Sequence, residues 1–133
     1  GAHPSTFGGN PVAVAASLAT IELLEEELID KAALIGEHMK SRMMEWHHRF
    51  PCVGDVRGLG LMLGVEIVRD QTTRERDPEL RNDIVQLAFH RGLLVLGAGP
   101  NSIRLSPPLI LSRDQADYAI DVLEEILRQA ASK

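Results

Sequence analysis

The first residues of the chain combine hydroxyl groups and glycines in a pattern that suits anion binding. In GAHPSTFGGNP, Ser5 and Thr6 precede two adjacent glycines, and Pro11 follows. Hydroxyls and glycine N–H groups near the N-terminus of a helix favour an anion such as phosphate. A plain capped loop has the same composition, because short Ser/Thr/Gly loops often precede helices. The residues alone leave both interpretations open, and they assign no role to His3.

Arg104 is the second candidate, because it lies inside an apolar stretch, SIRLSPPL. In a strand its side chain would lie on the face opposite to Ile103 and Leu105. Arginine is rarely buried without a partner, so that face is either solvent or a binding site. An oriented guanidinium recognises a carboxylate through two parallel hydrogen bonds. The sequence therefore predicts either a carboxylate site or an exposed strand face at Arg104.

The other reactive residue types form no catalytic or metal-binding set. His47 and His48 are adjacent, and neighbours on a helix point about 100° apart, so we expect exposed polar positions there and at His38. Cys52 is the single cysteine and is expected to be a buried thiol. We identify no nucleophile–base pair, carboxylate pair or metal cluster, so catalytic residues are not predicted in this chain.

Composition narrows the class of protein. The 133 residues fit one domain, and the net charge of −5 argues against a nucleic-acid partner. No apolar run reaches roughly eighteen residues, and the start does not read as a signal peptide, so no membrane association is expected. One cysteine suits a reducing compartment, and we expect a cytoplasmic protein.

The candidate loop leads into a long helical stretch that must position it. Residues 12–24 are small or aliphatic on every side, which is typical of a buried helix, and too few elements follow to cover them. We expect a break near Glu26 to Leu28, followed by an amphipathic helix that Pro51 ends.

The second half of the chain predicts a small sheet around Arg104. The expected elements after Pro51 are a strand at 53–56, a turn at 57–60, a strand at 61–68, an exposed loop from 71, a helix capped by Asp77 and ending at Gly92, strands at 93–96 and 103–105, and a helix capped by Ser112. The glycines at 58, 60 and 64 lack a strand–loop–helix setting, so they indicate a close sheet bend, not a dinucleotide site. Gly64 lies inside the strand expected at 61–68, where another backbone or a ligand could approach closely. The fold class is α+β, with helices packed on a small, mostly antiparallel sheet.

Three blocks of the sequence resemble one family. STFGGNPVAVAASLATIELLEEE, VGDVRGLGLMLGVEI and IRLSPPLIL are similar, in order and rough spacing, to the C-terminal part of class-III (omega-amino acid) aminotransferases. These are fold-type I enzymes that use pyridoxal 5′-phosphate. The resemblance implies that residues 1–26 end the large domain with an interdomain helix, and that residues 27–133 form the small C-terminal domain.

The resemblance also implies roles for particular residues. Ser5 and Thr6, with Thr6 the stronger candidate, would bind the phosphate of the cofactor held by the neighbouring subunit of a homodimer or higher homo-oligomer. Arg104 would bind the substrate carboxylate, while Arg57 and Gly58 would have a structural role. Pro4 departs from the family, in which many members have glycine before this serine.

The lysine that forms the Schiff base lies upstream of these blocks in the family. Lys31, Lys40 and Lys133 match no such motif. We therefore expect this chain to be the C-terminal part of a longer enzyme and to be inactive alone. The implied reaction moves an amino group from an omega-amino acid, with 4-aminobutyrate favoured, to a 2-oxo acid such as 2-oxoglutarate.

Alternatives remain open at this point. Within the same fold they are an acetylornithine or ornithine aminotransferase and an amino-acid racemase, because all of these substrates carry a carboxylate for Arg104. From a different class, a non-catalytic α+β interaction domain could use the apolar helix over 12–24 as a partner-binding surface.

Overall fold

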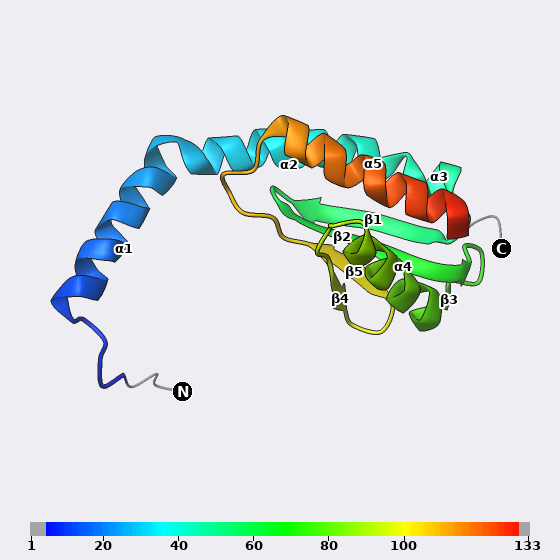
Figure 1. Ribbon diagram of the computed structural model, residues 1–133, viewed down its shortest axis with the longest axis horizontal. Helices are drawn as coiled ribbons and strands as arrows, with labels where there is room; N and C mark the ends of the chain where they lie inside the picture. The colour runs from blue at the N-terminus through cyan, green and yellow to red at the C-terminus, as the bar shows by residue number, and fades with distance from the viewer. Residues whose placement is uncertain (1–4, 131–133) are drawn as a thin grey trace.

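The computed structural model describes residues 5–130; residues 1–4 and 131–133, among them His3, Pro4 and Lys133, lie outside the described part (Figure 1). The helices are α1 (Pro11–Leu23), a π-helical segment (Leu24–Leu28), α2 (Ile29–Met44), α3 (Trp46–Arg49), α4 (Pro78–His90) and α5 (Arg113–Ala130). The strands are β1 (Val53–Leu59), β2 (Met62–Asp70), β3 (Glu75–Arg76), β4 (Leu96–Ala98) and β5 (Ser102–Leu105).

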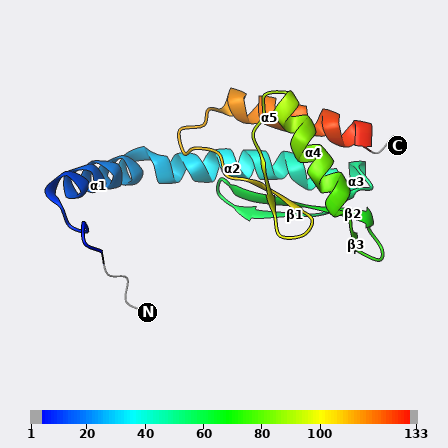
Figure 2. The same cartoon turned by 60° about the horizontal axis from the view of Figure 1, so that its bottom comes forward.

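The strands form one small sheet with helices on a single face. The strand order is β1-β2-β5-β4, with β3 paired to β2, and every pairing is antiparallel. Helices α2, α4 and α5 lie on the same side of this sheet, and no helix formed by residues 5–130 lies on the other side (Figures 1 and 2). The predicted α+β fold is confirmed, and one face of its sheet stays open.

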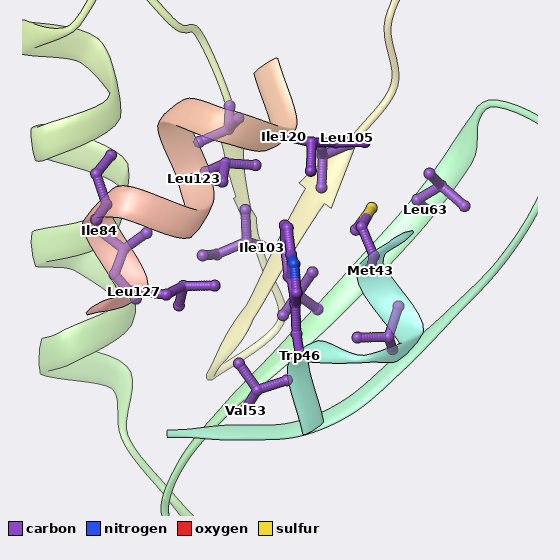
Figure 3. Packing of buried hydrophobic residues seen from close by; sticks show 14 of the residues in the cluster. Met43, Trp46, Val53, Leu63, Ile84, Ile103, Leu105, Ile120, Leu123 and Leu127 are labelled. Atoms are coloured by element: carbon purple, nitrogen blue, oxygen red, sulfur yellow. The ribbon is translucent and has the colours of Figure 1, made fainter. Parts of the chain in front are cut away.

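The core lies between the sheet and these helices, and it is mostly aliphatic, as the scarcity of aromatic residues requires. Alternate residues of β2 and β5, such as Val65 and Ile103, are buried beneath the helices. Trp46 is almost completely buried among them, and the aliphatic side chains of α5 pack from above (Figure 3). Burial of these alternating residues decides which face of each strand points to the helices.

Sequence reasoning misplaced the boundaries of the four expected strands, by the most in β1 and β4, and missed β3. Residues 57–59 belong to β1, not to a turn, because their backbones continue the pairing with 62–64. The strand expected at 93–96 is instead β4, which pairs with β5 at 102–104. The short β3 lies in the stretch that we expected to be loop. Strand ends follow backbone pairing, and a polar segment can pair without an apolar pattern.

The turn that remains between β1 and β2 is pressed against α2. Gly60 has a φ of +53°, and a Cβ atom on Gly36 of α2 would overlap the Gly60 backbone. The Lys40 ammonium, also on α2, donates a hydrogen bond of 3.0 Å to the Gly58 carbonyl. The prediction of a close bend at these glycines is therefore confirmed, although the bend is shorter than expected. The bend holds the β1–β2 hairpin against α2.

Helix α1 projects away from the rest of the domain (Figure 1). None of its residues is buried, and Val12, Leu18 and Leu23 are among its exposed apolar side chains. At the predicted break, the Ile29 N–H donates to the Leu24 carbonyl, so the helix widens to a π-turn without being interrupted. The apolar surface that the sequence predicted to need cover is indeed exposed.

Two other helix starts follow the predicted caps. Asp77 Oδ1 accepts a hydrogen bond of 3.0 Å from the Leu80 N–H, and Ser112 Oγ accepts one of 3.2 Å from the Gln115 N–H. In the described part of the chain, no helix is both long and apolar enough to cross a bilayer.

Candidate functional site

Arg104 lies on the open face of the sheet. Its neighbours Ile103 and Leu105 are buried on the helix side, while Arg104 itself is exposed. Among residues 5–130, no hydrogen bond or ion pair reaches its guanidinium. The alternation of β5 thus presents an unpaired cation on the one face that the helices leave uncovered.

Strand pairing places Arg104 in a row of four residues across this face. Gly64 of β2 lies directly opposite Arg104, and Arg57 of β1 lies opposite Gly64 on the other side. Leu96 of β4 completes the row beyond Arg104. Directly opposed residues share a face of an antiparallel sheet, so both arginine side chains rise on the open side with the glycine between them.

A groove of about 480 Å³ follows this row on the open face. Arg57, Gly64 and Arg104 line it, together with Glu66 and Arg76. Three arginines against one glutamate make this groove positive, although the whole chain carries a net charge of −5. Such a groove attracts anions.

The acidic residues next to the row are already engaged. Asp55 and Glu66 lie opposite each other on β1 and β2. Asp55 Oδ2 accepts a hydrogen bond of 2.8 Å from Arg57, and Arg74 pairs with Glu66 at 3.5 Å. These ion pairs offset the repulsion that two opposed carboxylates would otherwise have. The carboxylates therefore do not neutralise Arg104.

The loop before α1 has the features that a phosphate needs. Ser5 and Thr6 are exposed, and no other described residue hydrogen-bonds either hydroxyl. Gly9 has a φ of +78°, and Asn10 closes the loop by accepting from the Ala13 N–H at 3.0 Å and donating to the Phe7 carbonyl at 2.8 Å. This loop leaves its hydroxyls available to a group from outside the described residues, so it fits an anion such as a cofactor phosphate.

The structure does not bring the loop and Arg104 together. The loop lies at the far end of α1, and α1 points away from the sheet (Figure 1). A helix of 13 residues alone spans roughly 20 Å. Within one chain, the two predicted sites are therefore separate.

The expectations for the histidines are partly wrong. His48 is exposed as expected, but His38 and His47 are half-buried because other elements pack over them. His38 Nε2 is 2.7 Å from Asp117 Oδ1, and His47 Nδ1 is 3.2 Å from the Val53 carbonyl oxygen. Over the described range 5–130, no cluster of three His, Cys, Asp or Glu residues could hold a metal ion.

Cys52 is a buried thiol, as expected. Burial raises the pKa of the Cys52 thiol. A hydrogen bond between the thiol and the Cys52 backbone lowers it, but by less. A thiol with a raised pKa is a poor nucleophile at neutral pH. Cys52 therefore has no part in the candidate site.

Sequence reasoning missed Asn101 as a residue of this region. It predicted a close approach of a backbone or a ligand at Gly64, but nothing local reveals that two arginines flank this glycine. Asn101 is buried, donates a hydrogen bond of 2.7 Å to the Ile67 carbonyl and lines the groove. The position of Asn101 directly after Gly-Pro in a turn is the only local signal for this buried hydrogen bond.

Curated relatives match nearly the whole of this chain. It is 41% identical over 125 residues to isoleucine 2-epimerase of Lentilactobacillus buchneri, and 42% identical over 125 residues to 4-aminobutyrate aminotransferase of Mycobacterium leprae (strain TN). These alignments cover 93% and 92% of this chain, and 28% of each relative. The chain thus spans less than a third of the length of these relatives.

A solved structure has the same fold. An amine transaminase from an uncultivated Pseudomonas species, described as PLP-bound, superimposes with a TM-score of 0.87 at 37% identity. The superposition covers 96% of this chain and 29% of that one. The family model for aminotransferase class-III matches residues 1–127. With the match extending over its loop, its helix α1 and its arginine-bearing sheet, this chain belongs to the class-III aminotransferase family.

Proposed function

We propose that these residues form the C-terminal part of a longer pyridoxal-phosphate-dependent aminotransferase, called the parent enzyme below. It transfers an amino group from an omega-amino acid, with 4-aminobutyrate favoured, to a 2-oxo acid such as 2-oxoglutarate. The observation that carries this proposal is the unpaired, exposed Arg104 on the open sheet face of a class-III aminotransferase chain. All of these substrates carry a carboxylate that a guanidinium binds well.

The chain supplies binding groups to this reaction and no reacting group. Arg104 holds the substrate carboxylate and so orients the amino end away from the sheet. Ser5 and Thr6 donate hydrogen bonds to the cofactor phosphate, and their loop leaves both hydroxyls exposed for this. Pyridoxal phosphate supplies an electron sink when bound. Because no lysine here matches the Schiff-base motif, we propose that the 133 residues alone have no transaminase activity.

The separation of the two sites supports an assembly of subunits. Ser5 and Thr6 precede α1, and α1 projects away from the sheet whose strand β5 carries Arg104 (Figure 1). We propose a homodimer in which the loop of one subunit completes the cofactor site of the other. Residues 1–26 belong to the large domain in this proposal, residues 27–133 form the small domain, and the parent enzyme is cytoplasmic.

A second candidate is an amino-acid racemase. Isoleucine 2-epimerase, at 41% identity, supports it as directly as the aminotransferase relatives support the first candidate. Arg104 would bind the carboxylate of an α-amino acid in the same way. Acetylornithine and ornithine aminotransferases remain candidates on the same argument.

The proposal is tested by an amino-donor screen on the parent enzyme with pyridoxal phosphate. The donors are 4-aminobutyrate, N-acetylornithine and ornithine with 2-oxoglutarate, and single enantiomers of α-amino acids without an oxo acid. We expect glutamate to form, fastest from 4-aminobutyrate. Inversion of an amino acid without glutamate formation supports the racemase instead, and a protein that neither binds the cofactor nor acts on any donor refutes both.

Arg104→Lys checks the assigned role in the same assay. A lysine cannot reproduce the two parallel hydrogen bonds of the guanidinium. We expect KM for carboxylate substrates to rise by about tenfold to a hundredfold, because this is the change in affinity that the loss of a hydrogen bond to a charged group produces. An unchanged KM and kcat/KM would show that Arg104 does not bind substrate.

A further inference from the structure

The open sheet face holds a second arginine in register with Arg104. Arg57 and Arg104 lie on either side of Gly64 in one cross-strand row. Neighbouring strands are about 4.8 Å apart, so the two arginine Cα atoms are separated by roughly 10 Å. Both side chains are exposed, and both line the groove. A ligand above Gly64 therefore lies between two guanidinium groups.

Gly64 differs from other glycines of this region in having no structural requirement for its missing side chain. A Cβ atom at Gly58 would overlap the β2 backbone, and one at Gly36 would overlap Gly60. A Cβ atom at Gly64 would meet only the Arg57 and Ile103 carbonyl oxygens, each at 3.9 Å, which is ordinary contact. The fold thus tolerates a side chain at position 64, and its absence leaves the groove open between the arginines.

Arg57 keeps donors for a ligand despite its ion pair. Its Nη1 donates to Asp55 Oδ2 at 2.8 Å, and no other interaction of its guanidinium is found within residues 5–130. A guanidinium carries five N–H donors in a planar fork. The Asp55 contact therefore orients Arg57 on the open face and leaves most of its donors unused.

We propose that Arg57 is a second carboxylate-binding residue, which holds the same substrate carboxylate as Arg104 above the floor made by Gly64. This inference rests on the proposed function and extends it to Arg57, for which the sequence predicted only a structural role. A carboxylate has about four lone-pair sites and can accept hydrogen bonds from two guanidinium groups together. A substrate without a carboxylate gains nothing from this pair.

The test measures binding of a carboxylate that carries no amino group. Butyrate is titrated by calorimetry into the parent enzyme, and its Kd is compared among Arg57→Gln, Arg57→Lys, Gly64→Ala and Gly64→Leu. Arg69→Gln is the matched control, because Arg69 is an exposed arginine on the same sheet that pairs with Glu75 and does not line the groove. Melting temperatures confirm that each variant is folded.

We expect Arg57→Gln to raise the butyrate Kd by about tenfold or more, as the loss of a hydrogen bond to a charged group predicts. Arg57→Lys should recover part of this affinity. Gly64→Ala should raise Kd modestly and Gly64→Leu should abolish binding, both with the melting temperature retained, while Arg69→Gln should leave Kd unchanged.

Two results separate the failure of this inference from the failure of the proposed function. An unchanged Kd in Arg57→Gln, with Kd raised in Arg104→Lys, overturns the role of Arg57 and leaves the carboxylate site of Arg104 in place. An unchanged Kd in all variants, Arg104→Lys included, overturns the carboxylate site itself. If Arg57→Gln does not fold, Arg57→Lys decides the question: a raised Kd supports the role of Arg57, and an unchanged Kd overturns it.

Discussion

Two hydroxyl side chains that look alike in the sequence differ in what they can bind. Thr20 Oγ1 in α1 donates a hydrogen bond of 2.8 Å to the Ala16 carbonyl, so its helix already uses it. Thr6 lies before the helix, where no other described residue takes its hydroxyl. Of the two, the Thr6 hydroxyl, which has no partner among the described residues, is the one available to a phosphate.

This contrast predicts the effect of Thr6→Ala in the parent enzyme. We expect the Kd of pyridoxal phosphate to rise, because a hydrogen bond to a charged phosphate is worth about 1.5–3 kcal/mol, or roughly tenfold to a hundredfold in affinity. Equilibrium dialysis of the cofactor gives the value. Thr20→Ala is the control and should leave the Kd unchanged; equal values for Thr6→Ala and the unaltered protein would remove Thr6 from the cofactor site.

At the scale of elements, a buried glutamate joins three helices. Glu124 of α5 is 8% exposed and accepts hydrogen bonds from Trp46 Nε1 at 3.0 Å and from Arg49 Nη2 at 2.8 Å, both on α3. Arg42 of α2 lies 3.6 Å from the same carboxylate. Burial alone would raise the pKa of Glu124, but the bonds from Arg49 and Trp46 outweigh it, and the pKa lies below its ordinary value. The helix layer over the sheet is therefore held partly by one ionised carboxylate.

Glu124→Gln should lower the free energy of unfolding at pH 7 by about 1.5–3 kcal/mol, since it removes the charged partner of Arg49. Because the folded pKa is depressed, the carboxylate stabilises the fold above its unfolded pKa, near 4.3, and this contribution is lost as pH falls through the folded value. Urea unfolding from about pH 6 to pH 3 should therefore show a smaller loss of stability in Glu124→Gln than in the unaltered chain.

Glu125→Gln provides the control for this experiment. Glu125 is adjacent in sequence and pairs with Arg91 at 2.5 Å, but its side chain is 55% exposed. Exposed ion pairs contribute little to stability, so we expect a change below about 1 kcal/mol. If Glu124→Gln and Glu125→Gln behave alike at every pH, the buried carboxylate does not stabilise the helix layer.

At the scale of the whole molecule, α1 is an apolar helix without a partner among the described residues. Its side chains Val12, Leu18 and Ile21 are 80%, 57% and 48% exposed. Apolar surface of this extent on a projecting helix favours association. The domain core, in contrast, contains no residue of α1 and does not depend on it.

We therefore expect the 133-residue chain to self-associate through α1 when it is studied alone. Leu18→Lys combined with Ile21→Lys should abolish this association without lowering the melting temperature, because neither residue is buried. Sedimentation velocity over a range of concentrations gives the association state. Leu94→Lys is the control, since Leu94 is 81% exposed but lies outside α1; a chain that stays monomeric at high concentration contradicts the prediction.

The sequence by itself determined where three helices begin, and it determined the family. Pro11, Asp77 and Ser112 mark helix starts through local chemistry, which acts over a few residues and so can be interpreted without the fold. The apolar composition of residues 12–24 correctly predicted a helix that its own domain does not cover. Three sequence blocks sufficed to identify the class-III aminotransferase family.

Only the tertiary structure decided which residues share the open sheet face. Arg57, Gly64 and Arg104 are far apart in sequence and meet because backbone hydrogen bonds set the register of β1, β2 and β5. A shift of one residue in either pairing would turn a side chain to the other face, and no local pattern specifies that register. The strand boundaries were wrong for the same reason, since pairing partners, and not the residues of one segment, determine where a strand ends.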